Sequence, residues 1–451
     1  MGTIAGISGP DHIQTKQLRI ASLASENPKM VFTSLAHYID VHWMYEAYRR
    51  TKKGGATGVD EQSSSDFEKN LTENLKDLVE KFKSGNYKAP PVRRIYLEKG
   101  DGKKRPIGIP TFSDKVLQRA VTMVLEPLYE RDFYDFSYGF RPKKSTHEAV
   151  DAVREHLRLT KGGWIVEIDI SGFFDNISHG HIRNFLDRRV RDGVVRRAID
   201  KWLNAGIMED GNIQLSCQGT PQGGVISPLA ANIFLHELVD KWFMKEVVSR
   251  VRGARMFRYA DDIVMTFRSR ADAERVLRAS RKRFEKYELA LHPEKTKIVK
   301  FLNPVRDQGQ RQGSIDFLGF TLYWRKGRKG RWGLWRKTRK EKLRKSLREV
   351  YEWCKEERHR KVAWQHEKLS AKLKGHYEYF GVTGNWTWLN KFYDGVCRAW
   401  QKWLNRRSQK KHLSKKTFYE RLRRNPLPLP RIVRGNGKSL SESPDPSGRM
   451  F

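Results

Sequence analysis

The chain has 451 residues, of which 38% are hydrophobic, and it carries a formal net charge of +37 from 89 lysine and arginine residues against 52 aspartate and glutamate residues. This composition excludes a membrane-spanning protein, because no stretch approaches the roughly 18 consecutive apolar residues that a transmembrane helix needs. It leaves enough apolar residues for a sizeable core in two or three domains. A positive charge this large predicts a polyanionic partner.

The N-terminal segment and the cysteines bear on the compartment. Residues 1–33 show no strong periodicity, so we expect a loose arm there, and they lack the continuous apolar core of a signal peptide. Cys217, Cys354 and Cys397 lie far apart, without metal-ligand or disulfide spacing. We therefore expect a cytoplasmic protein with three free thiols and no membrane partner.

Helical and extended patterns alternate in the first part of the chain. Apolar and aromatic residues recur at helical spacing over residues 34–50 and again over 67–83. Between them, residues 51–60 form a basic, glycine-rich loop that lacks the Gly-Lys-Ser/Thr ending of a P-loop. Residues 92–109 predict a β-hairpin with a Gly-Asp-Gly turn, which presents several cations on a short, stiff support.

The middle of the chain predicts three helices, a strand and a loop. The helical patterns cover residues 114–128, 179–204 and 227–242. Residues 164–169 are a hydrophobic run with alternation towards its end, so Asp169 should close a half-buried strand. Residues 217–224 form a polar, glycine-rich loop. Glycines let a backbone approach a ligand closely, and Gln222 can hydrogen-bond to that ligand.

Residues 257–267 predict a second β-hairpin, in which two apolar runs flank Tyr-Ala-Asp-Asp and the acidic pair makes the tight turn. An isolated Asp-Asp turn is most often simply solvated. Adjacent carboxylates repel each other, however, so a fold that keeps both ionised usually supplies a hard divalent cation. If the strand ending at Asp169 lies beside this hairpin, Asp169, Asp261 and Asp262 converge across 261 − 169 = 92 residues. Such convergence predicts a two-metal phosphoryl or nucleotidyl transfer site.

The last part of the chain is basic and rich in tryptophan. Residues 321–451 hold 36 lysine and arginine residues against 11 aspartate and glutamate residues, and nine of the 13 tryptophans. This interleaving suits a nucleic-acid surface, because cations meet phosphates and flat side chains stack on unpaired bases. The alternative, which we favour for most of the tryptophans, is a helix-packing core. The elements expected here are strands over 289–301 and 317–323 and helices over 271–287, 337–353, 364–380 and 388–403.

Several stretches match, in order, the motifs of reverse transcriptases. Tyr259-Ala260-Asp261-Asp262 resembles the catalytic signature of that family, and Asp169 with Phe173-Phe174-Asp175 resembles its first catalytic motif. Further matching stretches begin at Arg105 (Arg-Pro-Ile-Gly-Ile-Pro), Tyr138 (Tyr-Gly-Phe-Arg-Pro), Gly219 (Gly-Thr-Pro-Gln-Gly-Gly), His292 (His-Pro-Glu-Lys-Thr) and Phe317 (Phe-Leu-Gly-Phe). Over roughly residues 34–434 the chain is similar to bacterial group II intron-encoded proteins, which are combined reverse transcriptases and maturases.

The resemblance implies an α+β protein with a right-hand polymerase fold, in which fingers and palm carry an antiparallel sheet and an α-helical thumb and a basic C-terminal region follow. The expected domains are an N-terminal arm (1–33), reverse transcriptase fingers and palm with an N-terminal extension (34–322), a helical thumb or maturase domain (323–404), a DNA-binding region (405–434) and a disordered tail (435–451). The tail lacks the cysteine pairs and histidines of the nuclease domain that many members carry, so we expect no endonuclease.

By the same resemblance, Asp169, Asp261 and Asp262 are catalytic, and together with Ile170 they hold two Mg²⁺ ions, for which Mn²⁺ can substitute. The implied nucleotide-binding residues are Lys99 and Arg105 at the triphosphate, Phe174 as a steric gate against a ribose 2′-hydroxyl, Gln222 beside the nucleotide, and Lys295 near the leaving pyrophosphate as a general acid. A solvated basic hairpin, a core phenylalanine and an exposed lysine are the alternatives for Lys99 with Arg105, for Phe174 and for Lys295.

The implied function is an RNA-directed DNA polymerase encoded by a group II intron, which also assists splicing and supports intron mobility by target-primed reverse transcription. Its partners are intron RNA, an RNA template with a DNA primer, target DNA and dNTPs in a bacterial cytoplasm. The implied nucleic-acid-binding residues are Arg141, Lys143, Lys144, Arg406, Arg407, Lys410 and Lys411. Two alternatives stay open: a bacterial reverse transcriptase without an intron, serving defence or diversification, and an RNA-binding splicing cofactor with little polymerase activity.

Overall fold

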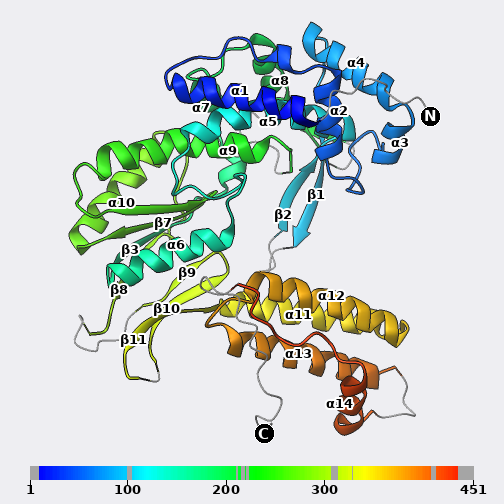
Figure 1. Ribbon diagram of the computed structural model, residues 1–451, viewed down its shortest axis with the longest axis vertical. Coiled ribbons are helices and arrows are strands. Elements are labelled where there is room, and N and C mark those ends of the chain that lie inside the picture. The colour runs from blue at the N-terminus through cyan, green and yellow to red at the C-terminus, as the bar shows by residue number, and fades with distance from the viewer. Residues whose placement is uncertain are drawn as a thin grey trace. The chain divides into compact units, whose positions relative to one another are not determined.

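The computed structural model describes residues 10–98, 104–209, 212–214, 219, 223–305, 313–327, 329–407 and 413–434. The chain divides into two compact units, whose elements are labelled in Figure 1. Unit 1 takes in the chain up to His156 and again from Gly162 to Lys300, and unit 2 takes in Leu157–Lys161 and the chain from Phe301 onwards. Both units combine helices with antiparallel strand pairs, so the expected α+β class is confirmed.

The main sheet of unit 1 has four strands in the order β6-β7-β3-β8. They are β3 (Gly162–Ile168), β6 (Arg255–Tyr259), β7 (Asp262–Phe267) and β8 (Lys297–Leu302), and the last residues of β8 already belong to unit 2. Strand β7 pairs antiparallel with β6 on one side and with β3 on the other. The strand expected over residues 164–169 therefore does lie beside the hairpin expected over 257–267.

Helices make up most of the rest of unit 1. They are α1 (Pro10–Glu26), α2 (Val41–Arg50), α3 (Ser64–Lys69), α4 (Leu71–Ser84), α5 (Phe112–Asp132), α6 (Thr146–Leu159), α7 (His179–Leu186), α8 (Gly193–Leu203), α9 (Ser227–Leu235) and α10 (Arg270–Glu285). The shorter segments are the 3₁₀ turns η1 (Ala36–Tyr38) and η2 (Phe173–Asp175) and the π-helical turns η3 (His236–Asp240) and η4 (Phe243–Val247). All the helices expected up to residue 287 are present, several of them divided in two, whereas α6 was not expected.

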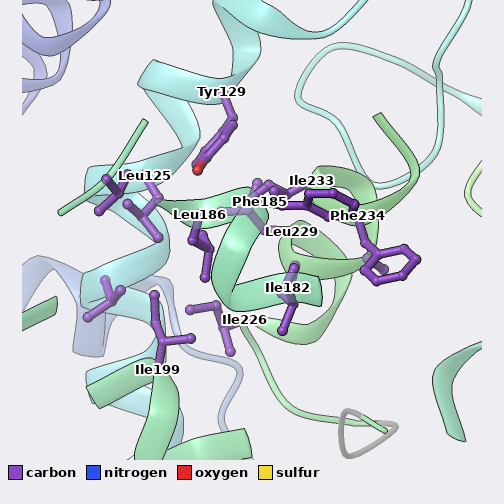
Figure 2. Packing of buried hydrophobic residues seen from close by; sticks show 14 of the residues in the cluster. Leu125, Tyr129, Ile182, Phe185, Leu186, Ile199, Ile226, Leu229, Ile233 and Phe234 are labelled. Atoms are coloured by element: carbon purple, nitrogen blue, oxygen red, sulfur yellow. The ribbon is translucent and has the colours of Figure 1, made fainter. Parts of the chain in front are cut away.

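The core of unit 1 is built where these helices meet. Figure 2 shows Leu125 and Tyr129 of α5 packed among apolar side chains of neighbouring helices, such as Ile182 of α7, Ile199 of α8 and Ile233 of α9. Helix α5 buries residues on all its sides along most of its length. A helix that is apolar all round belongs in the middle of a domain, and α5 takes this central position in unit 1.

Different helices cover the two faces of the main sheet. Val166 of β3 and its β7 partner Met265 are buried in the same core cluster as residues of α10. On the opposite face, the Thr266 hydroxyl lies 2.9 Å from Nε2 of His156 in α6. Successive side chains of a strand alternate between the two faces of a sheet. One face of β3 and β7 is therefore buried by the core, and the other face is covered by α6.

Helix α1 replaces the loose arm that we expected over residues 1–33, so that prediction was wrong for the described part of the segment. Ile13, Ile20 and Ala24 are buried in the core cluster of unit 1. The Gln17 side chain also donates a hydrogen bond to the carbonyl of Met123 in α5 at 2.9 Å. Spacings of seven and four residues place these three apolar side chains on one helical face, but so few of them give only a weak periodic signal.

A smaller sheet in unit 1 has the order β2-β1-β4-β5. Its strands are β1 (Val92–Glu98), β2 (Lys104–Ile109), β4 (Ile207–Glu209) and β5 (Asn212–Gln214). The antiparallel pairing of β1 with β2 confirms the hairpin expected over residues 92–109, whose turn lies outside the described residues. Strands β4 and β5 were not expected, because three residues are too few to show an alternating pattern.

Asp114, at the start of α5, joins three parts of unit 1 through a buried carboxylate. The carboxylate accepts hydrogen bonds from the Tyr87 hydroxyl, from Nε1 of Trp202 at 2.7 Å and from Nε2 of Gln118 at 3.0 Å. Gln118 in turn accepts a hydrogen bond from the backbone of Ile226 at 3.3 Å. This network therefore ties α5 to the segment before β1, to α8 and to the residue that precedes α9.

Unit 2 contains a three-stranded sheet and a set of helices. The strands are β9 (Ile315–Phe317), β10 (Phe320–Lys326) and β11 (Trp332–Thr338), and the helical segments are α11 (Lys340–Glu356), η5 (Glu357–His359), α12 (Val362–Phe380), α13 (Trp386–Asn405) and α14 (Lys415–Arg424). The three helices expected over residues 337–403 are confirmed. The first of them begins later than expected because residues 332–338 form β11, a strand that we did not expect.

The single strand expected over residues 317–323 is instead a hairpin. Phe317 pairs with Phe320, so Leu318 and Gly319 alone form the turn, and both have the positive φ that a type I′ turn requires, at 48° and 82°. The resulting sheet belongs to unit 2. The division of the chain therefore falls at residue 300, earlier than the boundary that we placed at 322.

Only some of the tryptophans of unit 2 are core residues, whereas both of its cysteines are. Trp400 and Trp403 are buried, whereas Trp386 is exposed and the other six tryptophans of this unit are half-buried. Cys354 and Cys397 are buried free thiols, and burial raises the pKa of each to about 12. Cys217 lies outside the described residues. Within the described part of the chain, no helix has the length and apolarity that crossing a membrane requires.

We predict that replacing Asp114 with asparagine removes a pH dependence of folding. Burial raises the pKa of Asp114 from 3.8 to about 6, so the folded protein retains a proton that the unfolded chain has released. The resulting stabilisation is present below pH 4 and is lost as the pH rises through about 6. Urea unfolding should be measured at about pH 4.5 and about pH 7. Between these two values, the free energy of unfolding of the parent should fall by about 2 kcal/mol more than that of Asp114→Asn. Equal losses for the two proteins would contradict this assignment.

Candidate active site

The Tyr-Ala-Asp-Asp hairpin forms the tight turn that we expected, but the turn is centred one residue earlier. Tyr259 pairs with Asp262, so Ala260 and Asp261 alone form the turn and Asp262 is the first residue of β7. The expectation that the acidic pair makes the turn was therefore wrong by one position. Of the two turn residues only Ala260 has a positive φ, at 54°, which matches a type II′ turn. Ala260 consequently occupies a conformation that L-residues adopt rarely.

The register of β3 against β7 brings Asp169 to this hairpin. Ile168 pairs with Ile263, so continuing the register by one residue places Asp169 opposite Asp262. Side chains directly opposite on antiparallel strands have Cβ atoms roughly 5 Å apart and lie on the same face. This face is the one that also carries Thr266, away from the main core. The sheet thus places Asp169 beside Asp262, in the hairpin whose turn contains Asp261.

The backbone on the other side of Asp169 is held by the segment before β8. The carbonyl of Asp169 accepts a hydrogen bond from the backbone of His292 at 2.8 Å, and its amide donates to the Thr296 hydroxyl at 3.2 Å. Ile170 forms an antiparallel bridge with Leu291 in which Asp169 and Ser171 supply the bonded groups. Neighbouring residues of a strand direct their backbone groups to opposite edges, so the carbonyl of Ile170 faces the hairpin side.

Lys295 lies at the carboxylate of Asp169. Its Nζ atom is 3.5 Å from Oδ2 of Asp169, and the lysine side chain is 61% exposed while the aspartate is 36% exposed. An ion pair this open contributes little to stability. The strand that we expected over residues 289–301 begins only at Lys297, so Lys295 lies in the preceding turn. There its ammonium group can reach the reacting groups around Asp169.

The donor chemistry of the site fits hard divalent cations, although the side chains are not arranged as a closed cage. In the part of the chain that the structure describes, no three Asp, Glu, His or Cys side chains are grouped closely enough to hold a metal ion. Asp169, Asp261 and Asp262 supply the carboxylate oxygens that Mg²⁺ prefers. The aliphatic side chain of Ile170 has no donor atom, so of that residue only the carbonyl oxygen could serve as a ligand.

A segment that precedes α6 packs directly against the turn of the hairpin. The Tyr138 amide donates to the carbonyl of Arg258 at 2.8 Å, and the Arg258 amide donates to the carbonyl of Phe136 at 2.9 Å. A Cβ atom on Gly139 would overlap the backbone nitrogen of Ala260 and lie 2.9 Å from the carbonyl carbon of Tyr259. Only glycine fits there. We did not expect this role of Gly139. The signal in the sequence that could have indicated it was a glycine within a recognised motif.

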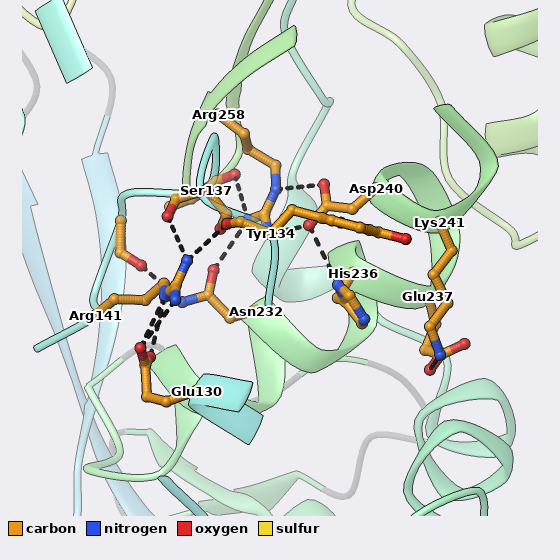
Figure 3. A network of polar contacts seen from close by, with 12 residues as sticks. Glu130, Tyr134, Ser137, Arg141, Asn232, His236, Glu237, Asp240, Lys241 and Arg258 are labelled. Atoms are coloured by element: carbon orange, nitrogen blue, oxygen red, sulfur yellow. Dashed lines mark hydrogen bonds and ion pairs between the residues drawn. The ribbon is translucent and has the colours of Figure 1, made fainter. Parts of the chain in front are cut away.

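Arg141 does not face template phosphates, so that prediction was wrong. Its side chain is almost fully buried, its Nε and Nη2 atoms bind Glu130 at 3.0 and 2.9 Å, and Nη1 donates to the carbonyls of Tyr134 and Ser137 (Figure 3). A buried guanidinium needs such partners, and Glu130, eleven residues earlier in α5, supplies the countercharge. Arg141 therefore fixes the loop that carries Gly139.

The two lysines after Arg141 remain closer to expectation. Lys143 is exposed, with a φ of 59°. The Nζ atom of Lys144 lies 5.3 Å from the centre of the Tyr138 ring and 3.9 Å from the Asp135 carboxylate. Both pairings of Lys144 are weak at a surface, so its ammonium group can exchange them for a phosphate.

Among the expected nucleotide-binding residues, Phe174 is well defined. It lies in η2, five residues after Asp169, and its half-buried ring packs edge-on against Phe173 with the ring centres 5.3 Å apart. Part of its surface therefore stays open, as a steric gate requires. Lys99 and Gln222 lie outside the described residues. For Arg105 only the backbone is described, where it pairs with Leu97.

The loop that contains Gln222 is anchored at both ends. The Gly219 amide donates to the carbonyl of Ile177 at 2.8 Å, and the Gly219 carbonyl lies 2.6 Å from Nε2 of His179. At the other end, a Cβ atom on Gly223 would overlap the carbonyl oxygen of Gly108 in β2. Its described ends therefore lie against the segment after Asp169 and against the small sheet.

The basic residues expected to bind nucleic acid in unit 2 are only partly described. Nη2 of Arg407 donates to the carbonyls of His359 and Arg360 at 3.1 and 2.8 Å, so this guanidinium closes the turn between α11 and α12. The guanidinium of Arg406 is exposed and lies 5.5 Å from the ring centre of Trp403. Lys410 and Lys411 lie outside the described residues.

Comparisons with known proteins identify related chains. The family described as "Reverse transcriptase (RNA-dependent DNA polymerase)" matches residues 97–322, which include β2, β4 and β5 of the small sheet, Asp169 and the hairpin. Protein YkfC of Escherichia coli is 33% identical over 321 residues, which are 63% of this chain and 84% of YkfC. Group II intron-encoded protein LtrA of Lactococcus lactis is 39% identical over 232 residues, 50% of this chain and 38% of LtrA. An uncharacterized 91 kDa protein in the cob intron of Schizosaccharomyces pombe is 36% identical over 161 residues, 36% of this chain and 20% of that protein.

We predict that Gly139→Ala disables the site while the fold persists. The added Cβ would press on the backbone of Ala260, and displacing a reacting group by about 1 Å can cost about 100-fold in rate. Gly180→Ala, in the exposed part of α7, is the matched control, because its Cβ would meet only Ser178 Oγ at 3.8 Å. Steady-state nucleotide incorporation, with thermal unfolding of each variant, makes the comparison. Parent-like incorporation by Gly139→Ala would show that the contact is unimportant.

Proposed function

The chain belongs to the reverse transcriptase family of RNA-directed DNA polymerases, and we propose that Asp169, Asp261 and Asp262 carry its catalysis on RNA of a group II intron. The observation that carries the catalytic assignment is the β3–β7 register, which places Asp169 opposite Asp262 within the stretch that matches the family. The right-hand fold that the family implies would use unit 1 as fingers and palm and unit 2 as thumb.

The reaction joins a primer to a nucleotide by phosphoryl transfer. The primer 3′-oxygen forms a bond to the α-phosphorus of a dNTP, the bond from that phosphorus to the β-phosphate oxygen breaks, and pyrophosphate leaves. Asp169, Asp261, Asp262 and the carbonyl of Ile170 would hold two Mg²⁺ ions, for which Mn²⁺ can substitute. When bound, such ions lower the pKa of the attacking hydroxyl and neutralise charge on the leaving group.

Other residues of the chain bind and orient the substrates. Lys295 would give a proton to the leaving pyrophosphate, since its exposed ammonium group lies next to the Asp169 carboxylate. The open part of the Phe174 ring would exclude a ribose 2′-hydroxyl. The anchored loop would present Gln222 to the nucleotide, and Lys99 and Arg105 on the β1–β2 hairpin would bind its triphosphate. Lys143 and Lys144 would contact template phosphates.

The proposed RNA partner rests on charge and on the named relatives. Residues 321–451 carry 36 − 11 = +25 formal charges, far more than a folded domain needs for solubility. One relative is by name a group II intron-encoded protein. We propose that unit 2, with residues 405–434 contacting target DNA, binds the intron RNA and assists its splicing in a bacterial cytoplasm, and that polymerisation on primed target DNA supports mobility.

We predict that Asp261→Asn and Asp262→Asn abolish DNA synthesis and leave RNA binding intact. Losing one carboxylate of the site removes several kcal/mol of transition-state stabilisation, so the rate should fall on the order of 1,000-fold. RNA affinity should change less than about twofold, because most of it comes from cations elsewhere. Primer extension on an RNA template with dNTPs and Mg²⁺, together with filter binding to intron RNA, measures both quantities.

Asp77→Asn is the matched control, since Asp77 is an exposed aspartate of α4 that pairs only with Lys81 among the contacts described. It should keep both activities. If the parent protein does not extend primers but binds structured intron RNA tightly, the splicing-cofactor alternative replaces the polymerase assignment. If the Asp261→Asn protein loses RNA binding and synthesis to the same extent, the proposed division between catalytic and binding residues is wrong.

A further inference from the structure

A buried ion pair lies directly behind the catalytic hairpin. Arg258 of β6 and Asp240 of η3 both have fully buried side chains, with Nε to Oδ1 at 2.8 Å and Nη2 to Oδ2 at 2.5 Å (Figure 3). Burial raises the pKa of Asp240, but the charge of Arg258 and the hydrogen bonds from Arg258 and His236 together outweigh it, so the pKa is lowered. Both partners are therefore ionised in the interior. We call this the Arg258–Asp240 pair.

The third nitrogen of Arg258 reaches the catalytic turn itself. Nη1 donates to Oδ1 of Asn232 at 2.9 Å and to the carbonyl of Ala260 at 3.3 Å. Ala260 is the turn residue with a positive φ, and it immediately precedes Asp261. A residue in such a conformation costs free energy and persists only where its surroundings fix it. Arg258 supplies one of those fixed contacts from inside the protein.

The helical segment formed by α9 and η3 also holds the segment before α6, which packs on the outer side of the catalytic turn. Nδ2 of Asn232 in α9 donates to the carbonyl of Gly139 at 2.7 Å, and the backbone of Gly139 abuts Ala260. Asp240 lies in a π-helical turn that continues α9, and such turns occur frequently at functional sites. The turn is thus held between two groups that α9 and η3 position together.

Stability alone does not account for this arrangement. A buried ion pair is often no more stabilising than apolar side chains of the same volume. Arg189 and Asp132 form a comparable forked pair in unit 1, at 2.8 and 3.1 Å, but the remaining nitrogen of Arg189 donates to the carbonyls of Asn27 and Met30, far along the chain from the catalytic turn. The two pairs therefore differ in what the spare nitrogen holds.

From these contacts we infer that the Arg258–Asp240 pair positions the catalytic turn, by fixing the Ala260 carbonyl so that Asp261 and Asp262 present their carboxylates to divalent cations. The inference rests on the proposed function and extends it to two positioning residues that do not touch substrate. Lysine cannot replace Arg258 in this role, because one ammonium group cannot reproduce the forked contact with Asp240 and also reach Asn232 and Ala260.

The test compares Arg258→Lys with Arg189→Lys, which makes the same chemical change in the matched pair. Mn²⁺ binding, followed by electron paramagnetic resonance, gives a readout independent of polymerisation, and Asp261→Asn identifies the relevant site. Arg258→Lys should weaken Mn²⁺ binding at that site by roughly 10- to 100-fold, the usual effect of losing a group that orients ligands. The kcat of primer extension should fall similarly, while the KM for dNTP and the affinity for primer-template stay within about threefold.

Arg189→Lys should lose comparable thermal stability and keep the parent's Mn²⁺ affinity. Should Arg258→Lys fail to fold, Asn232→Ala keeps the ion pair and should give a smaller loss in the same direction. The inference is overturned if Arg258→Lys or Asn232→Ala binds Mn²⁺ like the parent, if Arg189→Lys loses as much affinity, or if the parent has no Mn²⁺ site that depends on Asp261. A parent that binds Mn²⁺ but extends no primer refutes the proposed function, while the Mn²⁺ comparison still decides the positioning role.

Discussion

One register places the proposed catalytic residues Asp169 and Asp262 opposite each other, the antiparallel pairing in which Ile168 of β3 lies opposite Ile263 of β7. A slip of β3 by a single residue would turn Asp169 towards the main core, away from the face that carries Asp262, because side chains alternate between the faces of a sheet. The register is enforced by apolar residues such as Val166 and Met265, whose burial would be lost in any slipped arrangement. Hydrophobic burial therefore brings together carboxylates that would repel each other on their own.

Charge is distributed at two scales in this protein. The chain as a whole is strongly basic, which attracts nucleic acid and does so less as salt rises. At the end of β3 and the start of β7 the sign is reversed, and acidic side chains gather in a small region. Behind that region the interior contains arginines whose countercharges come from neighbouring helices, Glu130 for Arg141 and Asp240 for Arg258. Long-range attraction and local cation chemistry are thus carried by different residues.

The sequence predicted those parts of the site that depend only on residues close together in the chain. Asp169 at the end of an apolar run and the acidic pair between two such runs predicted the strand and the hairpin. The centre of the turn was wrong by one residue, because the pairing of Tyr259 with Asp262 depends on how two strands align. Leu318 and Gly319 did contain a turn signal, the glycine, but the apolar residues on both sides made a single strand the simpler prediction.

Contacts between distant segments could not be predicted in this way. The sequence around Arg141 does not indicate whether its guanidinium faces solvent or Glu130, since that depends on how the loop folds back on α5. Arg258 precedes a recognised motif and looks like one more basic residue in a basic chain, yet it is fully buried. Helix α1 was missed for the opposite reason, because its few apolar residues acquire meaning only once α5 is available to pack against.

The contact between Gly223 and the carbonyl of Gly108 has a mechanical consequence. Two backbones that touch without an intervening side chain leave no soft layer between them. Any movement of β2 at Gly108 is therefore transmitted directly to the backbone of Gly223. Because Gly223 directly follows Gln222, which we propose to contact the nucleotide, a substrate that shifts β2 would also shift the backbone next to that residue.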